Sequence, residues 1–322
     1  MTALVTLRDL AVSFDGTPAL RGIDLAIARG EALGMVGESG CGKSVTWLAA
    51  LGLLPGKARV TGSVTLDRAE ILHAKPAVLD RLRGGRIAMI FQDPASSLNP
   101  VHRLGKQVCE ALRLHRGLTG AAARAEAKRL FDLVGIPDAA RRLDAFPHEL
   151  SGGQNQRVMI AMALAGEPEL LIADEPTTAL DVTIQAQILD LLARLRREMN
   201  MALVLISHDL GVVADACDRV AVMYAGRIVE EAPIARIFAE PAHPYTHGLI
   251  GALPPIDGPR RPLAAIPGQV PDPRAMPKGC AFAPRCPRRI DACEVAIPES
   301  RVMAAEHRAA CLRAEAFEAV HA

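Results

Sequence analysis

Short hydrophobic segments alternate with amphipathic, helix-like segments over about the first 235 residues. The most apolar segments read ALGMVG, RIAMIF, ELLIAD, ALVLIS and RVAVMY. Each is short and apolar nearly throughout, which is typical of strands that a parallel sheet buries on both faces. Strands that alternate with helices in this way predict an α/β domain with a largely parallel core sheet.

Three further regions have other patterns. The segments VTLRDLAVSF and ARVTGSVTLD alternate apolar and polar residues, which predicts half-exposed antiparallel strands. The segment TGAAARAEAKRLFDLVGI has helical periodicity and a capping candidate in Thr119, and it predicts a helical subdomain at about residues 93–167. After Ala232 the chain is rich in proline and loses its periodicity. We therefore expect one domain over residues 1–232 and an irregular C-terminal extension over residues 233–322.

Composition excludes several classes of protein. Half of the 322 residues are hydrophobic, so the chain can bury a large core, and the net charge of +1 is not that of a nucleic-acid-binding protein. No apolar run reaches the ~18 residues that a membrane-spanning helix needs, and the N-terminus does not resemble a signal peptide. These features predict a soluble cytoplasmic chain whose thiols are reduced.

The segment GESGCGKS, residues 37–44, follows a predicted strand and precedes a predicted helix. This is the P-loop pattern in its expected context, which makes a chance glycine-rich turn a weak alternative. Lys43 is predicted to reach the β- and γ-phosphates of a nucleotide, and Ser44 to coordinate Mg²⁺. The backbone N–H groups that surround the phosphates would come from Gly37, Glu38, Ser39, Gly40, Cys41 and Gly42.

The segment LLIADEP places two carboxylates at the end of a predicted buried strand. Ligands bind at this edge of open α/β sheets, so Asp174 is predicted to hold Mg²⁺ through water. Glu175 is predicted to act as the general base that polarises the attacking water. The alternative is an acidic pair at a helix N-terminus, which the loop residues Pro176 and Thr177 disfavour.

The segment LSGGQNQRV, residues 150–158, resembles the signature of the ATP-binding cassette (ABC) ATPases, and other motifs follow that family's order. The resemblance implies that the chain binds ATP and Mg²⁺, and that the signature of one cassette closes over the P-loop of a second one. Taken singly, an aromatic residue or a histidine would more often be structural. The resemblance implies adenine stacking by Phe14, Mg²⁺ and partner sensing by Gln92, γ-phosphate contacts by Ser151, Gly152, Gly153 and Gln154, a D-loop role for Asp181, and a switch role for His208.

Four stretches narrow the resemblance to ATPase subunits of dipeptide and oligopeptide importers: FQDPASSLNP, FPHELSGG, HPYTHGLI and the cysteine-containing tail. This implies a second, different ATPase subunit, two transmembrane permeases and an extracytoplasmic solute-binding protein. The surface just after Gln92 would contact a permease, and the chain would lie on the cytoplasmic face of the cell membrane as a peripheral subunit. Nickel, glutathione and sugar importers are alternatives, as is a soluble ABC ATPase of DNA repair or translation.

The tail gathers four cysteines with the spacing C-x5-C-x6-C-x17-C. A structural zinc site usually includes a tight C-x₂₋₄-C pair, which is absent here, whereas a Cys-Pro step also occurs in ferredoxins. The spacing and the importer resemblance favour a 4Fe-4S cluster, and zinc or no metal are the alternatives. The predicted ligands are Cys280, Cys286, Cys293 and Cys311, and the other three cysteines, Cys41, Cys109 and Cys217, are predicted to be structural.

Overall fold

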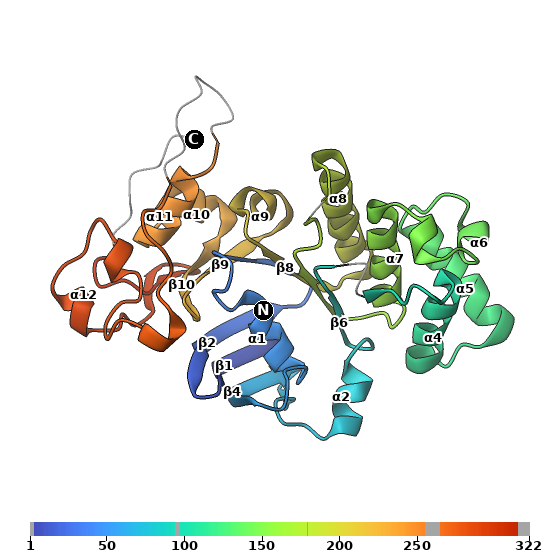
Figure 1. The fold of residues 1–322 in the computed structure, drawn as a ribbon, viewed down its shortest axis with the longest axis horizontal. Helices are drawn as coiled ribbons and strands as arrows, with labels where there is room; N and C mark the ends of the chain where they lie inside the picture. The colour runs from blue at the N-terminus through green and yellow to red at the C-terminus, as the bar shows by residue number, and fades with distance from the viewer. Residues whose placement is uncertain (1–2, 94–96, 179, 255–264, 315–322) are drawn as a thin grey trace. The chain divides into compact units, whose positions relative to one another are not determined.

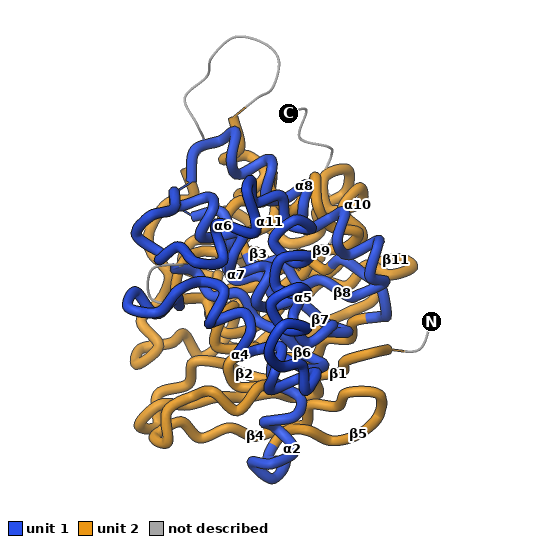
Figure 2. The backbone as a smooth tube through the Cα atoms, turned by 90° about the vertical axis from the view of Figure 1, so that its right-hand side faces the viewer, with its two compact units in different colours: residues 1–2, 28–32, 73–206 blue, residues 3–27, 33–72, 207–322 orange. Residues whose placement is uncertain are grey.

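The computed structural model describes residues 3–93, 97–178, 180–254 and 265–314. It divides into two compact units, coloured blue and orange in Figure 2. The first unit contains the described parts of residues 28–32 and 73–206. The second unit contains the described parts of residues 3–27, 33–72 and 207–322.

The strands of the first unit are parallel. They are β6 (Ile87–Ile90), β7 (Leu170–Asp174) and β8 (Ala202–Ser207). β7 pairs with β6 on one side and with β8 on the other, with Leu170 opposite Ile87 and Ala202. Every residue of β7 and β8 is buried, which confirms the buried parallel strands expected from the uninterrupted apolar runs.

Helices make up most of the first unit (Figure 1). They are α2 (Pro76–Leu82), α4 (Leu104–Arg116), α5 (Gly120–Leu133), α6 (Ala139–Arg142), α7 (Gly152–Leu164) and α8 (Val182–Met199). α4 and α5 pack against each other and both contact α7. Leu130 and Phe131 of α5 are fully buried there. Thr119 is the N-cap residue of α5, but its side chain makes no capping hydrogen bond.

The second unit contains a small antiparallel sheet of four strands in the order β2-β1-β4-β5. These strands are β1 (Ala3–Phe14), β2 (Thr17–Ala28), β4 (Ala58–Leu66) and β5 (Ala69–Glu70). β1 and β4 pair from Val5 opposite Leu66 to Phe14 opposite Ala58. The alternating patterns of these two segments therefore predicted the antiparallel strands correctly.

A second set of strands in this unit carries the P-loop. β3 (Ala32–Val36) runs parallel to β9 (Arg219–Tyr224), and β9 pairs with the antiparallel strand β10 (Arg227–Pro233). Two strands from the end of the chain continue the series: β12 (His307–Ala309) pairs with β10, and β11 (Arg301–Ala304) pairs with β12. Helices α1 (Lys43–Ala50) and α9 (Leu210–Ala216) belong to the same unit.

The C-terminal extension is more ordered than its composition predicts. It contains α10 (Ile234–Ala239), α11 (Pro244–Gly251) and α12 (Ala292–Val295) as well as β11 and β12. The buried carboxylate of Glu230 in β10 accepts hydrogen bonds from the N–H groups of Ala242 and His243 and lies 2.8 Å from Nε2 of His307. A buried charge requires such partners, so distant segments are held together by contacts that leave no periodicity in the sequence.

No helix in the described part of the chain combines the length and the apolar character needed to cross a membrane.

Candidate active site

The P-loop connects β3 to α1 in the second unit. Gly37 has φ +154° and Gly42 has φ +108°, in the region that favours glycine. A Cβ atom on Gly37 would lie 2.2 Å from the carbonyl oxygen of Met223, and one on Gly42 would lie 2.6 Å from Cδ2 of Leu20. Both positions therefore favour glycine, which lets the backbone turn tightly at the loop.

Lys43 is the first residue of α1 and is only 5% exposed. Its ammonium group donates hydrogen bonds to the carbonyl oxygens of Gly37 (2.7 Å) and Glu38 (3.2 Å). The loop thus holds the cation by its own backbone. Cys41 is also buried here, and burial raises the pKa of its thiol.

The predicted Mg²⁺ ligand and the predicted base follow each other in the first unit. Asp174 ends β7 and is 6% exposed, and Glu175 has a left-handed backbone with φ +46°. Oε2 of Glu175 accepts hydrogen bonds from Nε2 of Gln92 (3.1 Å) and Oγ1 of Thr178 (2.9 Å). A non-glycine residue in this conformation is held by its surroundings, which is common at functional sites. Sequence patterns did not single out Thr178.

The signature segment begins α7. Ser151 is the N-cap residue: its hydroxyl accepts a hydrogen bond from the Gln154 N–H (3.3 Å), and the Gln154 side chain accepts one from the Ser151 N–H (3.2 Å). This capping box fixes the first turn. A Cβ atom on Gly153 would lie 2.7 Å from Cγ2 of Ile184 in α8, so glycine is needed for close packing. Gly152 is exposed at the start of the helix.

Asp181 has a local structural role in the first unit. It is the N-cap residue of α8, and its carboxylate accepts a hydrogen bond from the Ile184 N–H at 2.9 Å. This bond satisfies one of the donors that a helix N-terminus leaves open.

The remaining predicted residues lie at the ends of strands or at the start of a helix. Phe14 is the half-buried last residue of β1, and His208 is exposed directly after β8, both in the second unit. Ser44 is half-buried in the first turn of α1. Residues 94–96, just after Gln92, belong to the predicted permease surface and lie outside the described residues.

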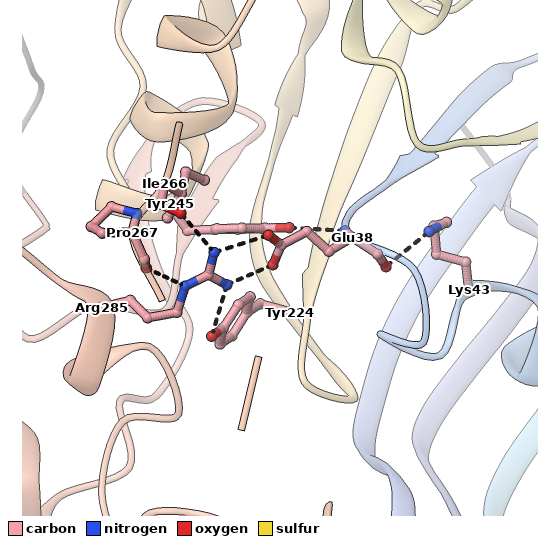
Figure 3. A network of polar contacts seen from close by, with 7 residues as sticks. All are labelled: Glu38, Lys43, Tyr224, Tyr245, Ile266, Pro267 and Arg285. Atoms are coloured by element: carbon pink, nitrogen blue, oxygen red, sulfur yellow. Dashed lines mark hydrogen bonds and ion pairs between the residues drawn. The ribbon is translucent and has the colours of Figure 1, made fainter. Parts of the chain in front are cut away.

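Residues from the C-terminal extension contact the P-loop, which the sequence did not reveal. Arg285 forms an ion pair with Glu38, and this pair raises the pKa of Arg285 (Figure 3). The hydroxyl of Tyr245 accepts a hydrogen bond from the Glu38 N–H at 2.9 Å. Tyr245 lies in the segment HPYTHGLI and Arg285 in the segment APRCP, and both segments resemble importer subunits. That resemblance did not assign a role to either residue.

The four tail cysteines lie close together in the second unit. They line a single small cavity of about 10 Å³, and burial raises the pKa of three of them, Cys280, Cys286 and Cys311. Among the described residues, no group of three or more His, Cys, Asp or Glu side chains has the arrangement of a metal site. Thiols are the donors that zinc and iron–sulfur groups use, so these four residues fit such a group by type but not by their arrangement in this structure.

Two protein families match this chain. The family described as "ABC transporter" matches residues 20–178. The family described as "Oligopeptide/dipeptide transporter, C-terminal region" matches residues 229–293. The two matches follow each other along the chain, so one family accounts for the P-loop and signature and the other for the start of the extension.

Individual relatives agree with these families. The oligopeptide transport ATP-binding protein OppD of Salmonella typhimurium is 50% identical over 92% of this chain and 89% of its own length. A putative peptide import ATP-binding protein of Brucella abortus is 52% identical over 88% of this chain and 87% of its own length. OppD of Mycobacterium bovis is 50% identical over 98% of this chain, which spans about half (52%) of that relative.

Solved structures give the same result for the fold. The cbiO1 protein of Clostridium perfringens, part of an ABC transporter complex, superposes with a TM-score of 0.64 at 29% identity over 74% of this chain and 91% of its own. The ATP-binding cassette MJ0796, solved as a dimer with ADP and Pi, superposes with a TM-score of 0.63 at 28% identity over 71% of this chain and 98% of its own.

Proposed function

The chain belongs to the family of ABC transporter ATP-binding proteins that carry the oligopeptide/dipeptide C-terminal region, and we propose that it powers peptide uptake by hydrolysing ATP. The observation that carries this proposal is the Glu175 carboxylate, which follows Asp174 at the end of a buried strand and is oriented by Gln92 and Thr178. A positioned carboxylate of this kind suits a general base for water.

Nucleotide binding would depend on the P-loop. Its glycines leave open the space that side chains would fill. The ammonium group of Lys43 is held by hydrogen bonds to backbone carbonyl groups of the loop. The backbone N–H groups and the ammonium would bind phosphates, and Phe14 would stack on adenine. Ser44, Gln92 and Asp174 are the residues that would hold Mg²⁺, which would supply positive charge to the phosphates.

Hydrolysis would use further residues. Glu175 would take a proton from the attacking water, and His208 would hold the γ-phosphate and the water. The capping box at Ser151 leaves a helix N-terminus that can offer N–H groups to a γ-phosphate. We propose that this contact is made across a pair of cassettes, to the nucleotide of a second ATPase subunit.

We propose the partners that the resemblance to importer subunits implies. They are a second, different ATPase subunit, two transmembrane permeases and an extracytoplasmic solute-binding protein. The chain would lie at the cytoplasmic face of the cell membrane as a peripheral subunit, held there by the permeases. The relatives are named for oligopeptide or peptide transport, which supports peptides as the transported solute.

We also propose a 4Fe-4S cluster on Cys280, Cys286, Cys293 and Cys311, with zinc as the alternative. Support comes from the convergence of the four thiols on one cavity. A bound cluster would crosslink four positions of the tail between Cys280 and Cys311.

Two measurements test the proposed function. The full chain should bind Mg-ATP, and Lys43→Ala should abolish that binding. Isolated from membranes, the tagged chain should copurify with permeases and show ATPase activity that increases with a solute-loaded binding protein. Nucleotide binding that is equal in wild type and Lys43→Ala, or recovery of the chain with no membrane protein, would contradict the proposal.

A further inference from the structure

The C-terminal extension contacts the P-loop through the side chain of Arg285. Nη1 of Arg285 lies 2.7 Å from Oε2 of Glu38, and Nη2 lies 3.0 Å from Oε1, so the two groups form a two-pronged ion pair (Figure 3). The Arg285 side chain is 3% exposed and that of Glu38 is 33% exposed. A bidentate pair with a buried guanidinium fixes direction as well as distance, which a surface ion pair does not.

Arg285 is itself held by contacts from the extension and from β9. Its Nε donates to the carbonyl oxygen of Pro267 at 2.9 Å, and its guanidinium lies 5.8 Å from the ring centre of Tyr224 and 5.9 Å from that of Phe282. Figure 3 shows the guanidinium of Arg285 with Pro267, Tyr224 and Glu38 around it. Movement of Arg285 would break these contacts, so the guanidinium is held in place opposite Glu38.

Glu38 passes this constraint to the predicted phosphate-binding lysine. Its backbone N–H donates to the hydroxyl of Tyr245 (2.9 Å), and its backbone carbonyl accepts from Nζ of Lys43 (3.2 Å). Glu38 therefore makes three polar contacts: its carboxylate with Arg285, its N–H with Tyr245 and its carbonyl with Lys43. Two of these three partners come from the extension, more than 200 positions away in the sequence.

We propose that Arg285 is a positioning residue of the nucleotide site, which keeps the P-loop ordered before nucleotide binds. This inference rests on the proposed function, because it assumes that the loop binds ATP. A loop that is already ordered binds its ligand without an added ordering cost. Loss of Arg285 should therefore weaken ATP binding and leave the rate of the chemical step nearly unchanged, since Arg285 acts through Glu38 and not on the reacting atoms.

The first test is a double-mutant cycle on the full chain. Arg285→Gln and Glu38→Gln should each raise the Kd for Mg-ATP about tenfold, the size expected when a hydrogen-bonded ion pair is lost. The double variant should be no weaker than either single variant, because both remove the same contact. In the assembled transporter, Arg285→Gln should change kcat at saturating ATP less than about twofold relative to wild type, and it should raise the KM for ATP.

Two companion variants keep this test valid if Arg285→Gln folds poorly. Arg285→Lys keeps the cation but loses the two-pronged geometry, so its Kd should rise about threefold. Arg289→Gln is the matched control: it removes an arginine–glutamate pair (Arg289 with Glu294, 3.8 Å) from the same extension, where the side chains are half exposed. Its Kd should equal that of wild type.

The second test needs no nucleotide. Hydrogen exchange of the amides in residues 37–42 should be roughly tenfold faster in Arg285→Gln than in wild type. Unchanged exchange together with unchanged Kd, or Kd effects that add in the double variant, would overturn the proposed positioning. If wild type does not bind Mg-ATP, the proposed function fails, and the exchange rates still show whether Arg285 orders the loop.

Discussion

Gln92 and Glu175 lie 83 positions apart, and the side-chain amide of Gln92 donates a hydrogen bond to Oε2 of Glu175 at 3.1 Å. Thr178 donates a second hydrogen bond to the same oxygen at 2.9 Å. Two donors on one oxygen restrict rotation of the carboxylate, so it is oriented before a substrate binds. Changes at Glu175 or Thr178 should therefore affect turnover more than nucleotide binding.

Replacement of the proposed base is the most direct consequence. Glu175→Gln keeps the shape of the side chain and one acceptor oxygen but cannot accept the water proton. In the full transporter complex we expect kcat for ATP hydrolysis to fall by about 10²–10⁴, the usual contribution of a general base, with the Kd for Mg-ATP retained. A hydrolysis rate like that of wild type would refute the role of Glu175.

The contact from Thr178 can be tested separately. Thr178→Val removes the hydroxyl donor at nearly constant volume and should lower kcat about tenfold, which corresponds to ~1.4 kcal/mol. Thr183→Val, at an exposed position in the first turn of α8, is the matched control and should leave steady-state ATPase kinetics unchanged. Equal rates in both variants would show that the Thr178 hydroxyl does not orient the base.

Two substitutions of Asp181 can distinguish its role as a helix N-cap from a role in ATP hydrolysis. Asp181→Ala should lower the free energy of unfolding by about 1 kcal/mol, because the Ile184 N–H loses its acceptor. Asp181→Asn should retain the cap and therefore the stability, as measured by urea denaturation. If Asn restores stability but ATPase activity stays low in the complex, Asp181 contributes through its charge as well; if Ala costs no stability, the capping role is wrong.

The burial of His243 predicts that the protein loses stability in mild acid. His243 is fully buried, and burial lowers its pKa from 6.5 to about 4. Between pH 6.5 and pH 4 the imidazole of His243 binds a proton in the unfolded chain but not in the folded chain. The contribution of neutral His243 to the free energy of unfolding is therefore present above pH 6.5 and is lost as the pH falls toward 4. The shift corresponds to about 3 kcal/mol in full, of which about 2 kcal/mol should be lost between pH 7 and pH 5.

His243→Asn provides the control for this pH dependence. Asparagine does not titrate, yet it can accept the hydrogen bond from the Tyr245 N–H that Nδ1 of His243 accepts at 3.0 Å. Urea unfolding at pH 7 and pH 5 should show a smaller stability difference in this variant than in wild type, by about 2 kcal/mol. The same difference in both proteins would assign the acid sensitivity to other groups.

The cysteine site can be examined by metal content. Anaerobically purified chain should be brown and hold about four iron atoms, and Cys286→Ser or Cys293→Ser should lose iron and absorbance. Cys109→Ser, outside the tail, should retain both. Removal of the iron by a chelator should lower the thermal stability of the extension. A colourless protein with one zinc per chain would replace the iron–sulfur assignment by the zinc alternative.

Local sequence patterns predicted much of the fold. The apolar run of β7 and the glycine turn after β3 are short-range features, because a strand of five residues and a loop of eight are specified by neighbours in the sequence. The extension was less predictable. Its strand β12 pairs with β10, where Glu230 lies opposite Ala309, and such a pairing depends on partners about 80 positions apart.

The candidate site shows the same division. The ordered motifs indicated Lys43 and Glu175 directly, since each lies in a segment with a characteristic spacing. Thr178 and Tyr245 carry no comparable signal: a threonine or a tyrosine in isolation has many structural uses, and only its hydrogen-bond partner shows what it contacts.

The sequence by itself determined the family, the P-loop and signature, and the presence of four clustered cysteines, because each depends on residue type and short spacing. Only the tertiary structure decided that Arg285 meets Glu38 across 247 positions and that Glu230 orders the extension. The physical reason is that a buried charge is stable only where packing brings its partners to hydrogen-bonding distance, and packing joins segments without regard to their order in the chain.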